Sequence, residues 1–403
     1  MRIDTTTTTT KTGYNVVLVS SGAVGVGCQR LGLSTRPSEL AKKQALAAVG
    51  QVHLMRYYDD LFSACNLACS QVLLTLDNLA NRGQYLNAAN TFAELLDYGV
   101  VPVVNENDTV AVEQLKIGDN DTLSAHVATL IQADWLFLLT DVDALYTANP
   151  NNDPTAKPIH EVADLWSLQV DTSTRGTQWG TGGMATKLTA ARIATAGGCN
   201  MAICHFADPS NVLKILRGEQ VGTVIRASAM PVRGRKRWVL SVPVKGELWL
   251  DPGAVRAVRD RRCSLFSAGV ICAKGDFLPH EAVRICDEDG REFGRGLTNY
   301  SREDVDKVKG MSSRNFIKAL GAGYGEEEII HRANLCLLVR RTGEDGGDDD
   351  YRHHDDAEED LHAEEEDSMS PAGLSRATTP ALAAVVEKAF SNSGGGGGVG
   401  GGG

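Results

Sequence analysis

Val16-Val17-Leu18-Val19 is a fully apolar run that leads directly into Ser20-Ser21-Gly22. Similar short apolar runs lie at 100–104, 136–139 and 201–204, and stretches with helical periodicity lie beside them at 39–62, 83–98, 122–132 and 183–196. Near-continuous apolar strands that alternate with amphipathic helices are typical of a parallel sheet covered on both faces. The sequence therefore predicts a three-layer αβα sandwich with a mainly parallel sheet over residues 14–229.

The pattern changes on either side of this region. Residues 230–244 are predicted to be a linker, and 245–340 contain short strand candidates between turns such as Asp251-Pro252-Gly253, which indicates a small, mainly β, barrel-like domain. Residues 1–13 form a low-complexity segment that we expect to be disordered. Residues 341–403 are acidic and then glycine-rich, so we expect an unfolded tail with at most a short helix near its end.

The composition places the chain among ordinary globular proteins with more than one domain. It has 403 residues, 42% of them hydrophobic and 23% charged. The net charge of −11 arises between positions 344 and 367, where fourteen acidic residues and one arginine give −13 and leave +2 for the rest. The folded part therefore lacks the basic excess that is typical of nucleic-acid-binding proteins, and we expect no nucleic-acid partner from the totals.

Cysteine usage and hydropathy bear on metals and membranes. The nine cysteines form no CxxC pair, which favours reduced thiols over zinc or disulfide sites. There is no apolar run of about 18 residues, so no membrane span is predicted. The opening MRIDTTTTTTK lacks the apolar segment of a signal peptide. We expect a cytoplasmic protein, with import into an organelle as the open alternative.

Five turns rich in glycine and small polar residues follow the predicted strands or begin the predicted helices. They lie at 20–27, 105–109, 118–122, 138–146 and 180–187. In an open parallel sheet, ligands bind beyond the carboxyl ends of the strands, so these turns are candidates for one binding site. The turn at 180–187 combines glycines, hydroxyls and a lysine at the start of a helix, which suits phosphate binding.

Structural explanations exist for single residues in these turns. The turn at 20–27 could be a tight strand-to-helix connection without a ligand. Asp108 could be a helix N-cap, and Asp121 or Thr122 could cap the helix that follows them. Lys187 could be an ordinary solvated lysine. None of these explanations accounts for all five turns together.

Six strings carry a resemblance to a known family. They are VVLVSSGAVGVG, KQALAAVGQ, VVPVVNENDTVA, KIGDNDTLSA, LLTDVDALYTANP and GTGGMATKLTAA, and they occur in this order. With them, residues 16–225 resemble the catalytic domain of the glutamate 5-kinases, members of the amino-acid kinase family. Residues 245–338 resemble the PUA domain that many glutamate 5-kinases carry after the kinase domain.

The resemblance implies a role for individual residues. Ser21, Asp108 and Asn120 are expected to contact L-glutamate, and Thr140 and Asp141 to contact ATP. Lys187 is the expected catalytic lysine, and Asp121 is expected to organise the cationic groups. The expected ATP-phosphate loop comprises Thr181, Gly182, Gly183, Met184, Ala185, Thr186 and Lys187. The implied reaction converts ATP and L-glutamate to γ-glutamyl phosphate and ADP, the first step of proline biosynthesis, in a homo-oligomeric enzyme.

This chemistry agrees with the residue types. A carboxylate nucleophile is already ionised at neutral pH, so no general base is needed. Catalysis then consists of holding two anions in line and neutralising the transferring phosphoryl group, which requires Mg²⁺ on ATP and lysine side chains. Asp108 is a natural acceptor for the ammonium group of the amino acid.

One departure from the resemblance concerns the N-terminal region. Family members begin the kinase domain with a strand that carries a lysine and a Gly/Ser phosphate loop, and no residues before Val16 supply them. We therefore expect a truncated kinase domain that lacks this strand and loop, with reduced activity.

Two other functions stay open at this point. The first is an inactive kinase-like protein whose PUA-like module binds RNA, suggested by the basic cluster of Arg256, Arg259, Arg261 and Arg262. Residues 246–342 nevertheless hold sixteen basic and fifteen acidic side chains, which weakens this hypothesis. The second is another amino-acid kinase, such as an acetylglutamate or aspartate kinase.

Overall fold

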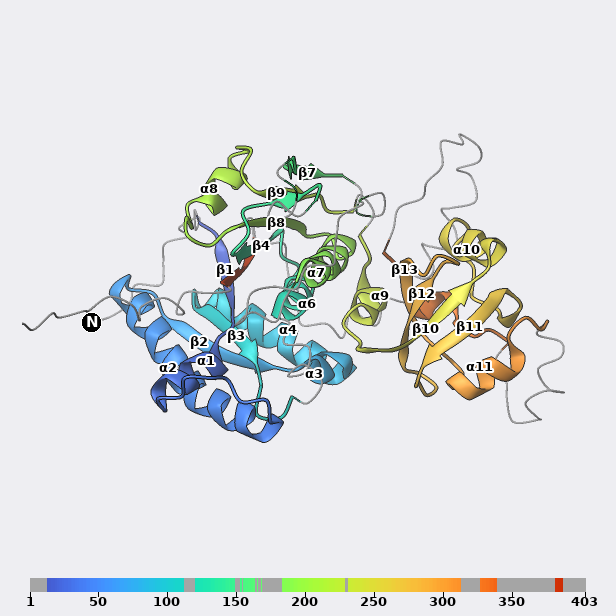
Figure 1. Ribbon diagram of the computed structural model, residues 1–403, viewed down its shortest axis with the longest axis horizontal. Coiled ribbons are helices and arrows are strands. Elements are labelled where there is room, and N and C mark those ends of the chain that lie inside the picture. The colour runs from blue at the N-terminus through green and yellow to red at the C-terminus, as the bar shows by residue number, and fades with distance from the viewer. Residues whose placement is uncertain are drawn as a thin grey trace, which may run out of the picture.

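The computed structural model describes most of the kinase-like region, most of the region after it and one short C-terminal strand. The described residues are 13–111, 120–148, 153, 155–163, 165, 168, 183–228, 231–312 and 327–338, with the backbone of 381–386. They form two bodies that lie side by side, an α/β body and a smaller β body (Figure 1).

An eight-stranded sheet forms the centre of the α/β body, in the order β2-β3-β1-β15-β4-β8-β9-β7. Its strands are β1 (Asn15–Ser20), β2 (Cys69–Leu74), β3 (Val101–Glu106), β4 (Trp135–Thr140), β7 (Glu161–Val162), β8 (Asn200–His205), β9 (Thr223–Ile225) and β15 (Ala381–Val386). All neighbouring pairs are parallel except β8 and β9. The predicted mainly parallel sheet is confirmed. A separate antiparallel pair is made by β5 (Leu145–Tyr146) and β6 (Pro158–Ile159).

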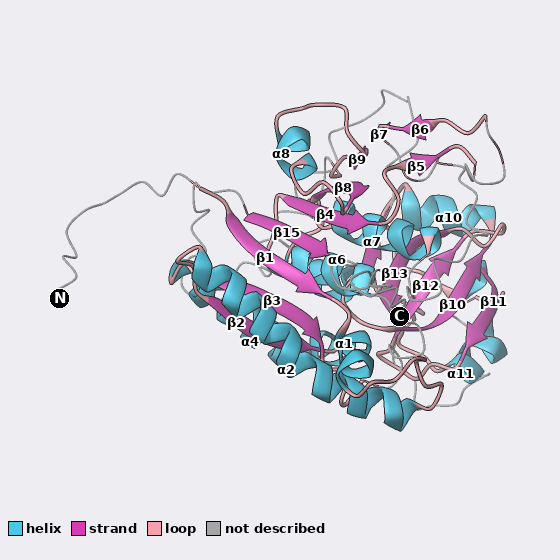
Figure 2. Cartoon of the chain, turned by 60° about the vertical axis from the view of Figure 1, so that its left-hand side comes forward, coloured by secondary structure: helices cyan, strands magenta, loops and turns pink. Residues whose placement is uncertain are grey.

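Helices cover both faces of this sheet (Figure 2). They are α1 (Ala23–Arg30), α2 (Leu40–Ala64), α3 (Leu76–Ala80), α4 (Arg82–Asp97), α6 (Asn120–Leu130), α7 (Met184–Ala196) and α8 (Asn211–Leu216). In β4, Leu136 and Leu138 pack in the core that holds α4, α6 and α7, whereas Phe137 and Leu139 pack with α8. This alternation follows from the two-residue period of a strand and produces the predicted three layers.

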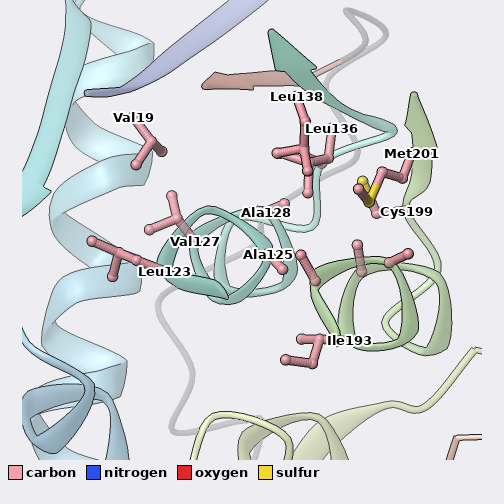
Figure 3. Packing of buried hydrophobic residues seen from close by; sticks show 14 of the residues in the cluster. Val19, Leu123, Ala125, Val127, Ala128, Leu136, Leu138, Ile193, Cys199 and Met201 are labelled. Carbon is pink, nitrogen blue, oxygen red and sulfur yellow. The ribbon is translucent and has the colours of Figure 1, made fainter. Parts of the chain in front are cut away.

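Helix α6 lies in the middle of the main core. Its Leu123 and Val127 face Val19 of β1, and Ala125 and Ala128 lie toward α7 (Figure 3). Small side chains on this side of α6 let the two helices approach closely. Helices α6 and α7 begin at the same end of the helical layer. Asp121 in the first turn of α6 therefore lies close to Lys187 in the first turn of α7.

The C-terminal strand β15 is the largest difference from the sequence prediction. Residues 381–386, expected to be unfolded or briefly helical, pair in parallel with β1 on one side and with β4 on the other. Within the described strands, β1 and β4 are joined to each other only through β15, so this strand connects the two halves of the sheet. An alanine-rich run has no marked strand propensity, and its position between two apolar strands decides its conformation.

The second body contains a five-stranded sheet in the order β11-β10-β12-β13-β14. Its elements are β10 (Val244–Leu250), α10 (Pro252–Arg259), the 3-10 turn η1 (Ser267–Gly269), β11 (Val270–Gly275), β12 (Ala282–Cys286), β13 (Glu292–Leu297), α11 (Arg302–Val308), η3 (Arg332–Asn334) and β14 (Leu335–Leu337). Side chains from all the strands close around one apolar core, as expected for a small, mainly β domain.

The segment predicted as a linker, 230–244, contains helix α9 (Gly234–Val239). Trp238 of α9 donates its indole N–H to the carbonyl oxygen of Ala80 at 3.1 Å, and Val239 and Leu240 pack with Ala196 of α7. The connection is therefore packed against both bodies instead of running free between them.

Candidate active site

The carboxyl ends of the parallel strands bring three polar segments to one edge of the sheet. Ser20 ends β1, Asn105 and Glu106 end β3, and Thr140 ends β4. The register places Ser20 opposite Val386, and Val386 opposite Leu139, next to Thr140. All of these strand ends therefore lie at the edge where ligands bind in such sheets.

A cluster of amide side chains connects β1, β3, α2 and α6 at this edge. Asn120 at the start of α6 donates to the carbonyl oxygen of Ser20 at 2.8 Å and to Oδ1 of Asn105 at 3.4 Å. Asn105 in turn donates to Oε1 of Gln51 at 2.8 Å. The cluster holds Asn120 beside Ser20 and therefore next to Ser21, although 100 positions separate Asn120 from Ser20 in the sequence.

Tyr58 of α2 also reaches this edge. Its hydroxyl lies 2.9 Å from Oγ of Ser20, and burial raises the pKa of the tyrosine. A neutral hydroxyl group therefore fixes the Ser20 side chain. Sequence reasoning assigned no role to Tyr58 or Gln51, although Gln51 ends one of the strings that carried the resemblance.

A buried ion pair joins the first turns of α6 and α7. Lys187 Nζ lies 3.0 Å from Oδ2 of Asp121, and the two residues are only 4% and 3% exposed. Thr186 donates its hydroxyl to the same carboxylate oxygen at 3.2 Å. Lys187 is thus no surface lysine, and the structural explanation considered for it is wrong. Burying two charges is unfavourable unless they are paired and hydrogen-bonded, which is the arrangement found here.

The start of α7 presents the described part of the expected phosphate loop. Gly183 precedes the helix in an extended conformation, its N–H donates to Oγ1 of Thr186, and Met184, Ala185, Thr186 and Lys187 form the first helical turn. The backbone N–H groups of a first turn carry partial positive charge and attract phosphate. Thr181 and Gly182 lie outside the described residues.

Thr140 and Asp141 follow each other at the end of β4. Thr140 is buried and donates its hydroxyl to Oδ1 of the exposed Asp141 at 3.2 Å, and its carbonyl oxygen accepts from the N–H of Phe206. Both residues lie at the same sheet edge as the amide cluster, on the far side of β15 from β1.

Asp108 lies in the turn after β3, three positions beyond Asn105. Burial raises the pKa of its carboxyl group to about 6, and the positive charge of Arg36 opposes this rise. Asp108 makes no hydrogen bond to the described side chains of the amide cluster, and Arg36 is the charged residue that acts on its carboxyl group.

In the part of the chain that the structure describes, no group of three or more His, Cys, Asp or Glu side chains is arranged to hold a metal ion. In the same part of the chain, no helix combines the length and apolar character of a membrane span.

The fold and the site define a class of protein. Residues 4–205 match the amino acid kinase family, and residues 246–320 match the PUA domain. The chain belongs to the amino acid kinase family, as the resemblance implied.

Three relatives that share more than half of their aligned residues with the chain are glutamate 5-kinases. The chain is 53% identical to glutamate 5-kinase from Rippkaea orientalis over 336 residues, covering 83% of this chain and 91% of the relative. It is 55% identical to glutamate 5-kinase from Synechococcus elongatus over 328 residues, covering 81% and 89%. It is 54% identical to glutamate 5-kinase from a Nostoc species over 330 residues, covering 81% and 87%.

Proposed function

We propose that the chain is a glutamate 5-kinase, which transfers the γ-phosphoryl group of ATP to the γ-carboxylate of L-glutamate in the first step of proline biosynthesis. The observation that supports this proposal most directly is the buried pair of Lys187 and Asp121 beside the amide cluster. It puts a cation at the sheet edge where the two anions of this reaction must meet.

Each part of the edge has a function in this reaction. The N–H groups of the first turn of α7 and the ammonium group of Lys187 attract the ATP phosphates. Magnesium carried by ATP supplies further positive charge. Asn120 and Ser21 orient the γ-carboxylate, and Asp108 attracts the ammonium group of glutamate. Asp121 holds Lys187 in place through their 3.0 Å contact.

The carboxylate of glutamate needs no base to attack, because it is ionised at neutral pH. The protein's contribution is then orientation and charge. Removing one preorganised charged contact of this kind typically lowers kcat by roughly 10²- to 10³-fold. Lys187→Met should show a loss of this size.

The test is formation of the acyl phosphate, trapped by hydroxylamine as the hydroxamate, with Mg-ATP and L-glutamate. Lys187→Met is compared with Lys214→Met, a change in a lysine on α8 whose ion pair with Asp208 is partly exposed. The proposal predicts hydroxamate from the unchanged chain and from Lys214→Met, and strong loss in Lys187→Met. Equal background in all three proteins would contradict it.

Three further expectations belong with this proposal. A cytoplasmic location and a homo-oligomeric state follow from the same assignment, and sedimentation of the purified chain tests the second of these. The PUA domain leaves RNA binding to be tested separately, and a steep salt dependence of RNA affinity would support it.

A further inference from the structure

Arg36 carries a donor that has no partner. The residue lies between the end of α1 and the start of α2 and is half-buried. Its Nε atom is buried and makes no hydrogen bond within the described structure. A buried donor without an acceptor is energetically unfavourable, so such groups are uncommon in folded proteins and require an explanation. A ligand that supplies an acceptor is one such explanation.

The opposite charge near Arg36 belongs to Asp108. The guanidinium group is close enough to affect the ionisation of the carboxyl group, yet no ion pair within 4 Å joins these two described residues. A positive and a negative side chain that lie near each other without forming an ion pair can bind the α-carboxylate and the ammonium group of one amino acid. The ammonium group of the ligand would face Asp108, and its α-carboxylate would face Arg36.

The chain and its hydrogen bonds connect this charge pair to the amide cluster. Asp108 follows Asn105 by three positions, and Asn105 contacts Asn120, whose neighbour in the chain is Asp121. The polar edge therefore runs from the Lys187–Asp121 pair, through the amides, to Asp108 and Arg36. If the γ-carboxylate is phosphorylated at the first end, the α-carbon with its two charged groups lies toward the second.

A second buried donor supports an acceptor-rich ligand along this edge. Nε2 of Gln51 is buried and unpartnered in the described structure, while Oε1 of the same side chain accepts from Asn105. An amide that is satisfied on its acceptor side and unsatisfied on its donor side favours ligand oxygen atoms nearby. Gln51 is neutral, whereas Arg36 carries a positive charge and can therefore discriminate an α-carboxylate from a neutral group. Its planar guanidinium group also matches the geometry of a carboxylate.

We propose that Arg36 is a specificity-determining residue, which binds the α-carboxylate of the substrate amino acid. This inference rests on the proposed function and adds a residue and a contact to it. It explains how the site would select an amino acid with an α-carboxylate over 4-aminobutyrate, which retains an ammonium group and the reacting carboxylate but lacks the α-carboxylate.

The experiment removes the proposed contact in two ways, by changing Arg36 in the protein and by using a ligand without the α-carboxylate. Arg36→Gln and the unchanged chain are each tested with L-glutamate and with 4-aminobutyrate, by calorimetric binding and by hydroxamate formation. A charged hydrogen bond of this type changes affinity by roughly 10- to 100-fold. Arg36→Gln should weaken glutamate binding and raise its KM by that factor, with kcat within about 2-fold because the reacting end is untouched. Binding of 4-aminobutyrate should not change.

Two variants act as controls. Arg30→Gln changes the last residue of α1, whose side chain contacts the hydroxyl of Tyr57 at the surface, and it should bind glutamate like the unchanged chain. Arg36→Lys retains the charge without the fork and should fall between Arg36→Gln and the unchanged chain. Thermal melting identifies any variant that does not fold.

The outcomes separate the two proposals. Equal weakening of both ligands in Arg36→Gln would show a merely structural arginine and overturn the assignment, as would unchanged glutamate binding. A chain that binds glutamate with this Arg36 dependence but forms no hydroxamate would contradict the proposed function and leave the Arg36 contact supported. A chain that does not bind glutamate would contradict both.

Discussion

The pair of Lys187 and Asp121 should matter to stability as well as to catalysis, and the two effects can be separated. Lys187→Met leaves the carboxylate of Asp121 almost fully buried without its cation. Removing one partner of such a pair typically destabilises by about 3–5 kcal/mol. For a domain of roughly 200 residues, each kcal/mol lowers Tm by about 2–4 °C, so we expect a Tm lower by about 6–20 °C.

A double-mutant cycle shows whether the loss arises from the pair. Asp121→Asn removes the charge and keeps the shape, and the double variant Lys187→Met/Asp121→Asn no longer contains an unpaired buried charge. Its Tm should recover much of the loss, with a coupling energy of about 2–3 kcal/mol. Lys214→Met breaks a partly exposed pair and should cost at most about 1 kcal/mol.

Calorimetry and hydroxamate formation are measured on the same preparations. We expect the double variant to be nearly as stable as the unchanged chain and still inactive, because the charge that attracts the phosphates is absent. Additive losses of stability, within about 0.5 kcal/mol, would show that the two side chains do not interact and would refute this reasoning.

Three other predictions follow from the packing and charges. Because the pKa of Asp108 is raised to about 6, its carboxyl group is mostly neutral below that pH and attracts an ammonium group less. The KM for glutamate should therefore rise as the pH falls from 7 to 5, and this pH dependence should be absent in Asp108→Asn. An identical pH profile in the variant would contradict the ammonium contact. A Cβ at Gly27 would overlap the carbonyl group of Leu46, whereas a Cβ at Gly25 of the same helix meets no atom. In thermal melting, Gly27→Ala should therefore destabilise the protein by roughly 1–3 kcal/mol, and Gly25→Ala should not. Ala384→Pro removes a backbone donor in the middle of β15 and should destabilise the α/β body by roughly 3 kcal/mol. A melting curve equal to that of the unchanged chain would show that β15 does not join the sheet.

The central strands could be predicted because their residues are apolar on both faces. The runs at 16–19, 136–139 and 201–204 correspond to β1, β4 and β8, each of which is one residue longer at both ends. Strand β2 was not predicted, because its sequence CSQVLL mixes polar and apolar residues and it lies at the edge of the sheet. Strand β15 was not predicted because its pairing with β1 bridges more than 360 positions of sequence, which no local pattern records.

The site shows a similar division. Lys187 stands in a turn whose residue types already indicated phosphate binding, and Asp121 stands in another of the five candidate turns. The structure brings the two side chains together at the starts of α7 and α6. Tyr58, Gln51 and Arg36 lie on or just before α2, and the packing of α1 against α2 decides where they point. Single polar residues on an amphipathic helix resemble ordinary surface residues in the sequence, so their role was visible only in three dimensions.

The roles assigned to Ser21, Asp108, Asn120, Thr140 and Asp141 stay predictions. In the structure the position between β1 and β4 is occupied by β15. Residues 1–12, which hold most of the segment predicted to be disordered, lie outside the described residues.

One substrate panel tests the account most directly. The unchanged chain is given Mg-ATP with L-glutamate, N-acetyl-L-glutamate or L-aspartate, and hydroxamate is measured with each. A carboxylate beside Lys187 should be phosphorylated only when the same ligand has a free ammonium group and a carbon chain that lets this group reach Asp108. We predict hydroxamate from L-glutamate at a rate at least about 100-fold above the other two, since a charged group left unpaired costs several kcal/mol. Equal rates with the three acids, or a preference for N-acetyl-L-glutamate, would contradict it.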